Sequence, residues 1–257
     1  MLKFKNIIVK TPCQNMINGI SSANLGKVDY KNALKQHKNY IDTLKKIKLN
    51  VKVMPLDEHY PDSCFVEDVL VATDKFAILT NPGAKARNGE KGKMAVFFAR
   101  NFKLPVHYIE YPGSLDGGDV MMVGNKFYIG KSERTNMEGI KQFEQIVSQY
   151  KSTVIPVEMK EMLHLKTGLS YLEHNNLLIY GEFVKNPLFK SFNQIVIDKD
   201  ESYAANSIWL NDVVIVPAGY PKTKAAIEAL GIYKVVTCDT SEFRKLDGGL
   251  SCLSNRF

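Results

Sequence analysis

The sequence predicts an α/β protein built from repeated strand–turn–strand units with helices between them. Short apolar runs occur in pairs around tight turns, and amphipathic stretches at helical spacing separate some of these pairs. The turn centres at Asp74, Asn125, Asn175 and Asn211 also recur at long intervals, although the last interval is shorter than the others. Recurrence on this scale is typical of blades or repeats.

Four hairpins follow one another along the chain. The predicted strand pairs are 69–72 with 76–79, 120–123 with 127–129, 170–172 with 177–179, and 208–210 with 213–216. We expect a fifth unit from strand 7–9 together with the C-terminal segment. Five units could close a ring, which would protect the sheet edges and bring Cys252 toward the axis.

Three stretches carry helix signals. Asp29 opens one helix that runs through Ile47, and another follows Asn136. Pro221 and Gly231 mark the start and the stop of a third helix. No flexible linker and no shift of composition divides the chain, so we expect a single catalytic domain over residues 1–257.

Composition limits the classes of function. At 257 residues and 45% hydrophobic content, the chain can bury a substantial core. Its apolar runs are too short to span a bilayer and the N-terminus lacks a signal-peptide core, so we expect a cytoplasmic protein with no membrane partner. The net charge of +7 comes from scattered lysines, so we expect no nucleic-acid partner. A homodimer is compatible with these features.

The four cysteines are widely separated and form no CxxC pair, which argues against a zinc site and a disulfide framework. No histidine has the spacing of a metal site, and we expect no cofactor. Cys252 stands out because it follows a glycine pair close to the end of the sequence. Read alone, it is more easily explained as a small apolar core residue.

His164 gives Cys252 a chemical interpretation. A thiol needs a nearby base or cation to act as a nucleophile, and His164 is the best candidate partner in the sequence. Asp116, which precedes the glycine pair 117–118, could orient that histidine. Together these residues suggest cysteine-based hydrolysis. A structural histidine and ordinary turn chemistry for the glycines remain the alternatives.

Two sets of charged residues indicate a ligand with both charges. Asp62, Glu67 and Asp68 lie within one short, partly apolar segment and suit a cation, although a solvated acidic loop is the alternative. Arg87 and Arg134 follow strands and could clamp one carboxylate, because the guanidinium fork offers paired donors. Each arginine read alone is more simply a surface residue.

Seven segments, taken in order, resemble the dimethylarginine dimethylaminohydrolase family. They are 61–68, 115–119, 132–136, 164–166, 203–206, 217–221 and 247–252. The resemblance covers nearly the whole chain and implies membership of the guanidine-modifying enzymes. Their fold is a five-bladed α/β propeller, or pentein, of repeated ββαβ-type units with the active site in the central channel.

The resemblance also implies roles for individual residues. Cys252 would be the nucleophile, His164 the general acid and base, and Asp116 the carboxylate that supports the histidine. The implied substrate-binding residues are Ile20, Asp62, Glu67, Asp68, Arg87, Arg134, Leu246 and Asp247. Within this set, Asp68 would hold the guanidinium, the two arginines would bind the amino-acid carboxylate, and Ile20 and Leu246 would belong to a lid and a pocket wall.

The implied activity is hydrolysis of Nω-methylated arginines to citrulline and methylamine or dimethylamine, through a thiouronium intermediate on the cysteine. Two other functions remain open. One is an arginine deiminase-like guanidine hydrolase, and the other is a non-catalytic protein that binds an amino acid on the same fold.

Overall fold

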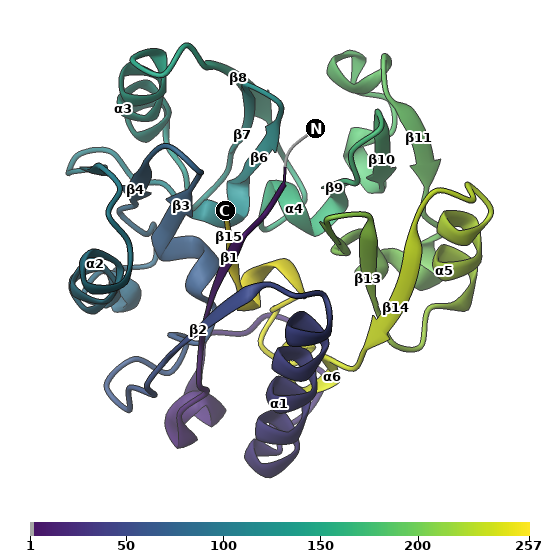
Figure 1. The fold of residues 1–257 in the computed structure, drawn as a ribbon, viewed down its shortest axis with the longest axis horizontal. Helices are drawn as coiled ribbons and strands as arrows, with labels where there is room; N and C mark the ends of the chain where they lie inside the picture. Colours follow the sequence, from purple (N-terminus) through teal and green to yellow (C-terminus); the bar gives the residue numbers. More distant parts are fainter. Residues whose placement is uncertain (1–2) are drawn as a thin grey trace.

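The computed structural model describes residues 3–257. In these residues, five three-stranded sheets stand around a central axis like the blades of a propeller (Figure 1). The middle strand of each sheet pairs antiparallel with one neighbour and parallel with the other. The predicted five-bladed α/β propeller is confirmed.

The strands, grouped by sheet, are β15 (Asn255–Arg256), β1 (Asn6–Lys10) and β2 (Asn50–Met54); β3 (Leu70–Ala72), β4 (Ala77–Leu79) and β5 (Val106–Tyr108); β6 (Val120–Val123), β7 (Lys126–Lys131) and β8 (Thr153–Glu158); β9 (Leu169–Tyr171), β10 (Asn176–Ile179) and β11 (Asn193–Val196); and β12 (Ile208–Leu210), β13 (Val213–Pro217) and β14 (Lys234–Cys238). The α-helices are α1 (Tyr30–Lys46), α2 (Glu90–Asn101), α3 (Met137–Ser148), α4 (Leu165–Gly168), α5 (Pro221–Glu228) and α6 (Ser241–Arg244).

All four predicted hairpins form, as β3–β4, β6–β7, β9–β10 and β12–β13. The last one turns at Asn211 and Asp212, whose φ angles of 51° and 70° suit a tight turn that matches the twist of the strands. The two ends of the chain build the remaining blade, because β1 pairs with β15 as well as with β2. The ring closes as expected.

The long helices lie on the outside of the ring (Figure 1). The carboxylate of Asp29 caps α1 by accepting the N–H of Asn32, and Asn136 caps α3 through the N–H of Gly139. These two helices and α5 were predicted. Helix α2 and the outer strands of the blades were not, because many of their residues are only partly buried and give a weak apolar pattern.

The blade β9–β10–β11 departs from the expected ββαβ unit. Between β10 and β11 the chain forms two short 3-10 segments, Gly181–Phe183 and Pro187–Phe189, in place of an α-helix. Gly181 has a φ of 64° and Pro187 fixes the backbone six residues later, and neither favours a continuous helix.

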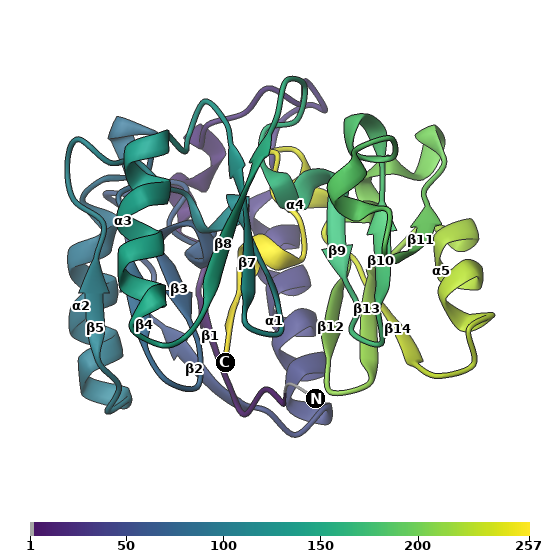
Figure 2. The same ribbon diagram turned by 90° about the horizontal axis from the view of Figure 1, so that it is seen from above.

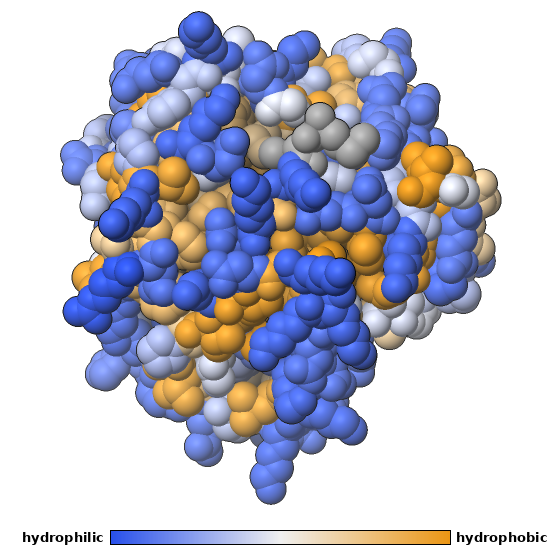
Figure 3. All heavy atoms as spheres, viewed as in Figure 1, coloured by the Kyte–Doolittle hydropathy of each residue, from blue (hydrophilic) through white to orange (hydrophobic). Residues whose placement is uncertain are grey.

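The core consists of several apolar clusters that join neighbouring blades. One cluster brings Ile8 of β1 together with Leu70 of β3, Phe98 of α2 and Phe257. On the face shown in Figure 3, hydrophilic residues cover most of the surface and hydrophobic ones show as separate patches among them. Within residues 3–257, no helix has the length and apolar character needed to cross a membrane. The single domain over residues 1–257 stays a prediction.

Candidate active site

The segments that carry Cys252 and His164 come from different blades and meet near the axis. Cys252 lies in the 3-10 turn Ser251–Leu253 directly before β15, and His164 is the residue that precedes α4. Figure 2 shows α4 and the C-terminal loop above the level of both chain ends. Cys252 and His164 line one pocket of about 280 Å³, together with Asp62, Asp68 and Arg134.

Three carboxylates surround the imidazole of His164. Its Nδ1 lies 3.4 Å from Oδ2 of Asp119, while its Nε2 lies 3.7 Å from Oδ2 of Asp116 and 3.9 Å from Oδ1 of Asp68. Burial alone would lower the pKa of His164, but the three carboxylates outweigh burial and raise this pKa to about 9. The imidazole is therefore protonated at neutral pH.

Asp119 is the functional residue that the sequence interpretation missed. It is fully buried, and its Oδ2 accepts hydrogen bonds from the hydroxyls of Ser132 at 2.7 Å and Thr135 at 2.6 Å. These bonds fix the carboxylate beside Nδ1 of His164. The signal was present, because Asp119 is the last residue of the Asp-Gly-Gly-Asp segment that begins at Asp116.

Asp116 lies beside the other nitrogen of His164. Its Oδ1 accepts the N–H of Gly83 at 2.8 Å, and its Oδ2 has no hydrogen-bond partner within residues 3–257. Burial and the nearby charge of Asp68 raise the pKa of Asp116 to about 7. Asp116 and Asp119 thus lie beside different nitrogens of the imidazole.

Asp68 is buried but ionised. Its Oδ2 accepts from Nη1 of Arg87, and its Oδ1 accepts the N–H of Gly118 at 3.0 Å. Burial raises the pKa of this carboxyl, but Arg87 and His164 more than reverse the effect and lower it. Gly118 is needed for this contact, since a Cβ there would lie 2.9 Å from both Oδ1 of Asp68 and Cγ of His164.

The guanidinium of Arg87 donates most of its hydrogen bonds to other residues of the protein. Arg87 is 5% exposed, and it donates to both carboxylate oxygens of Glu90, to Asp68 and to the carbonyl of Phe65. This arrangement weighs against the expected contact between Arg87 and a substrate carboxylate, and favours a role in holding Asp68. By contrast, Arg134 lines the same pocket and forms no ion pair among residues 3–257.

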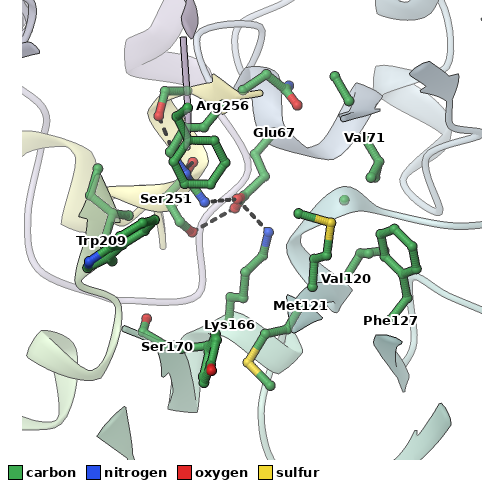
Figure 4. Close-up of a pocket in the computed structure, with 18 of the residues that line it drawn as sticks. Glu67, Val71, Val120, Met121, Phe127, Lys166, Ser170, Trp209, Ser251 and Arg256 are labelled. Carbon is green, nitrogen blue, oxygen red and sulfur yellow. Dashed lines mark hydrogen bonds and ion pairs between the residues drawn. The ribbon is translucent and has the colours of Figure 1, made fainter. Parts of the chain in front are cut away.

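Glu67 does not line the pocket of about 280 Å³, but it lines a smaller cavity of about 40 Å³ together with Cys252 and His164. Its carboxylate binds Nζ of Lys166 at 2.5 Å and the hydroxyl of Ser251 at 2.6 Å, and it lies 3.5 Å from Nη2 of Arg256. Figure 4 shows these side chains converging on Glu67 at the wall of another cavity. Glu67 thus has different partners from Asp62 and Asp68, although its charge still helps to raise the pKa of the Cys252 thiol.

The remaining predicted residues form the wall and cover of the pocket. The N–H of Ile20 donates to both carboxylate oxygens of Asp62, at 3.0 and 3.3 Å. Leu246 is 7% exposed and lines the wall. Asp247 accepts hydrogen bonds from the N–H and the hydroxyl of Ser22, so it ties the segment that contains Ile20 to the C-terminal loop.

Cys252 is a protonated thiol in the unliganded site. Its Sγ accepts the N–H of Gly249 at 3.3 Å. Burial is the main cause that raises its pKa to about 12, and the negative charges of Glu67 and Asp68 add to this. A positive charge bound in the pocket would favour the thiolate.

Asp68, Asp116 and His164 could also hold a metal ion, since one ligand atom of each lies within 4.8 Å of the others. Spacing in the sequence gave no sign of this trio. Asp68 already binds Arg87 and the N–H of Gly118, so a metal would compete with those contacts.

Comparison with known proteins agrees with this geometry. The family model "N,N dimethylarginine dimethylhydrolase, eukaryotic" matches residues 10–252. The chain is 50% identical to N(G),N(G)-dimethylarginine dimethylaminohydrolase of Pseudomonas aeruginosa, over 99% of this chain and all of the relative. It is 31% identical to the Streptomyces coelicolor enzyme of the same name, over 98% of this chain and 96% of the relative.

Solved structures give the same result. A cysteine-to-serine mutant of the Pseudomonas aeruginosa enzyme in complex with citrulline superposes with a TM-score of 0.98 at 49% identity, with all of both chains covered. The N-terminal domain of a cyanobacterial arginine dihydrolase has a TM-score of 0.87 at 19% identity, over 99% of this chain and 97% of that one, and supports the fold alone. The family model matches most of the chain, and two enzymes of the family are 50% and 31% identical to it over nearly its whole length. These matches show that this chain belongs to the dimethylarginine dimethylaminohydrolase family.

Proposed function

We propose that this chain hydrolyses Nω-methylated arginines to citrulline and methylamine or dimethylamine, through a thiouronium intermediate on Cys252. One observation carries the proposal: Cys252, the protonated His164 and the ionised Asp68 line one pocket with Arg134. An amino acid with a cationic side chain thus finds a complementary charge for each of its ends.

Asp68 and Asp62 would bind the guanidinium, because both carboxylates line the pocket beside Cys252. Arg134 would bind the α-carboxylate, and Arg87 would act indirectly by fixing Asp68. Ile20 and Leu246 would close the pocket around the aliphatic chain of the substrate.

The bound substrate would itself help to form the nucleophile. A guanidinium roughly 4 Å from the sulfur, at an effective dielectric constant of about 20, stabilises the thiolate by about 4 kcal/mol, or roughly three pKa units. Cys252 releases its proton to solvent when the cationic substrate binds, and the thiolate sulfur attacks the guanidinium carbon. The C–S bond forms as the carbon becomes tetrahedral.

His164 would then act twice. As the imidazolium, it gives a proton to the methylated nitrogen, so the C–N bond breaks and a neutral amine leaves the thiouronium. The neutral imidazole next takes a proton from water, whose oxygen attacks the same carbon. Collapse of that adduct breaks the C–S bond, and the hydroxyl proton of the adduct passes to the departing sulfur, so neutral citrulline and the Cys252 thiol are released. Asp119 keeps the imidazole oriented through both proton transfers.

A cytoplasmic location belongs to the same proposal. Cys13, Cys64, Cys238 and Cys252 all carry free thiols, as is usual in reducing compartments. Cell fractionation tests this point, and recovery in an oxidising compartment would contradict it.

A substrate panel tests the activity. Purified chain is given arginine, monomethylarginine, dimethylarginine and agmatine, and citrulline or the carbamoyl product is measured. We expect the methylated amino acids to have the highest kcat/KM. A preference for arginine would indicate a deiminase, and binding without any turnover would indicate a non-catalytic protein.

A further inference from the structure

Asn206 lies between the two catalytic segments, and the proposed chemistry gives it no role. It follows the 3-10 segment Lys199–Ala205 and is 7% exposed. Its side chain lines a small cavity of about 40 Å³ with Cys252 and His164.

Three hydrogen bonds join the Asn206 amide to both segments. Its Oδ1 accepts the N–H of Ser251 at 2.8 Å, while its Nδ2 donates to the Ser251 hydroxyl at 3.0 Å and to the carbonyl of Lys166 at 3.0 Å. Ser251 directly precedes Cys252, and Lys166 follows His164 within the same short turn. One side chain therefore ties the backbone of the nucleophile to the backbone of the acid–base residue.

Cys252 and His164 are not joined by a hydrogen bond of their own. Within residues 3–257, Sγ of Cys252 is bonded to the N–H of Gly249, and Nδ1 of His164 has no partner of hydrogen-bond geometry. No direct bond therefore fixes the separation of sulfur and imidazole, and this separation depends on how the two backbone segments are held relative to one another. Asn206 is the side chain that links those backbones directly.

The neighbours of Asn206 are adapted to this link. A Cβ on Gly249 would lie 2.5 Å from Cγ of Asn206, so a side chain there would displace the amide. The Ser251 hydroxyl also donates to Glu67, which binds Nζ of Lys166 (Figure 4). The bonds form a closed circuit that begins and ends at Lys166.

We propose that Asn206 is a positioning residue that fixes the distance between the sulfur of Cys252 and the imidazole of His164. The inference rests on the proposed function. Without the amide, the N–H of the buried Ser251 and the carbonyl of Lys166 lose these partners, and the two turns can move apart. A misplacement on the order of 1 Å costs about 100-fold in rate. Substrate binding depends on other residues and should persist.

Asn206→Ala tests this inference. We expect kcat for dimethylarginine to fall about 10- to 100-fold while KM stays within about threefold of the parent value. Rates are expressed per active site, counted by complete alkylation of Cys252 with a haloacetamidine, so that unfolded protein does not contribute. A merely structural role would lower the number of sites and leave kcat per site unchanged.

Asn176→Ala is the matched control. Asn176 is buried to a similar degree, and its Nδ2 donates to the hydroxyl of Tyr233 at 2.7 Å, in β10 and outside both pockets at Cys252. This variant should lose stability but keep kcat per site. Ser251→Ala removes one of the three bonds and should lower kcat by roughly three- to tenfold.

The proposal is overturned if Asn206→Ala has a kcat per site within about twofold of the parent value. If Asn206→Ala does not fold, the same limit applied to Ser251→Ala decides. If the parent chain itself fails to turn over methylated arginines, the proposed function is wrong instead. The two failures are therefore distinguishable.

Discussion

Glu67 and Asp68 are neighbours in the chain, yet their carboxylates are held by different partners. Asp68 lines the pocket of about 280 Å³ with Cys252 and is held by Arg87. Glu67 lines the cavity of Figure 4 as well as the cavity of about 40 Å³ at Cys252, and it is held by Lys166. Both are buried, at 4% and 3% exposure. Consecutive side chains in a 3-10 turn diverge, so the two adjacent acids reach different partners. We expect Asp68 to contact the substrate and Glu67 to hold Lys166 and Ser251 together.

The largest effect should come from Asp68→Asn. The substrate guanidinium loses its ionised partner, and the buried Arg87 loses a counter-charge. We expect kcat/KM for dimethylarginine to fall by about 1000-fold, which corresponds to about 4 kcal/mol. Steady-state kinetics measures the loss. If Glu67→Gln is equally damaging, the two carboxylates do not differ in role.

A smaller effect separates the two arginines. Arg134→Ala should lower kcat/KM for methylated arginines by roughly tenfold to a few hundredfold, mainly through KM, because a charge-assisted hydrogen bond of about 1.5 to 3 kcal/mol is lost. Slow turnover of a decarboxylated analogue should be nearly unchanged.

Arg87→Ala is the contrasting variant. Since Arg87 acts through Asp68, its loss should damage turnover of the amino acid and of the decarboxylated analogue alike. Equal losses for both substrates in Arg134→Ala would remove Arg134 from carboxylate binding.

The pH dependence of kcat/KM tests the environment of His164 in the free enzyme. The acid form is required for amine departure, so kcat/KM should fall as the pH rises through about 9. Because this pKa is raised above the ordinary 6.5, the same proton also stabilises the fold; that contribution is complete below pH 6.5 and is lost through about pH 9. Asp119→Asn should move this decline in kcat/KM to lower pH. A decline that stays near pH 9 would contradict the role of Asp119.

The smallest effect is expected from Glu67→Gln. The amide can still bond the Ser251 hydroxyl, and Glu67 does not line the substrate pocket. KM for dimethylarginine should therefore stay within about threefold of the parent value. A KM increase of about tenfold or more would place Glu67 in contact with the substrate.

The sequence predicted the ring of blades but not which charged residues of the site bind one another. The hairpins were readable because their strands are buried apolar runs and their turns, such as Asn211-Asp212, tolerate positive φ. The pairing of Cys252 with His164 was also predicted. The sequence did not predict that residues of the protein itself occupy the guanidinium of Arg87. One of these residues is Glu90 in the first turn of α2, and α2 has little apolar periodicity.

The role of Glu67 was hidden for a related reason. Its partner Lys166 lies 99 residues away, and only closure of the ring brings the two together. Asp119 could have been found, since it ends the Asp-Gly-Gly-Asp segment, but the hydroxyls that fix it come from the loop after β7, 13 and 16 residues further along the chain. Local patterns therefore predicted the elements and the candidate nucleophile, while partners distant in the sequence required the structure.

Covalent catalysis by Cys252 is tested most directly by intact-mass and peptide mass spectrometry of His164→Gly after reaction with S-methyl-L-thiocitrulline. That probe formed an adduct with a histidine-to-glycine mutant of a relative. Methanethiol should leave without His164, and hydrolysis should then stall. We predict one stable adduct, located on the C-terminal peptide that contains Cys252. Absence of an adduct, or an adduct on Cys13, Cys64 or Cys238, would contradict the assignment.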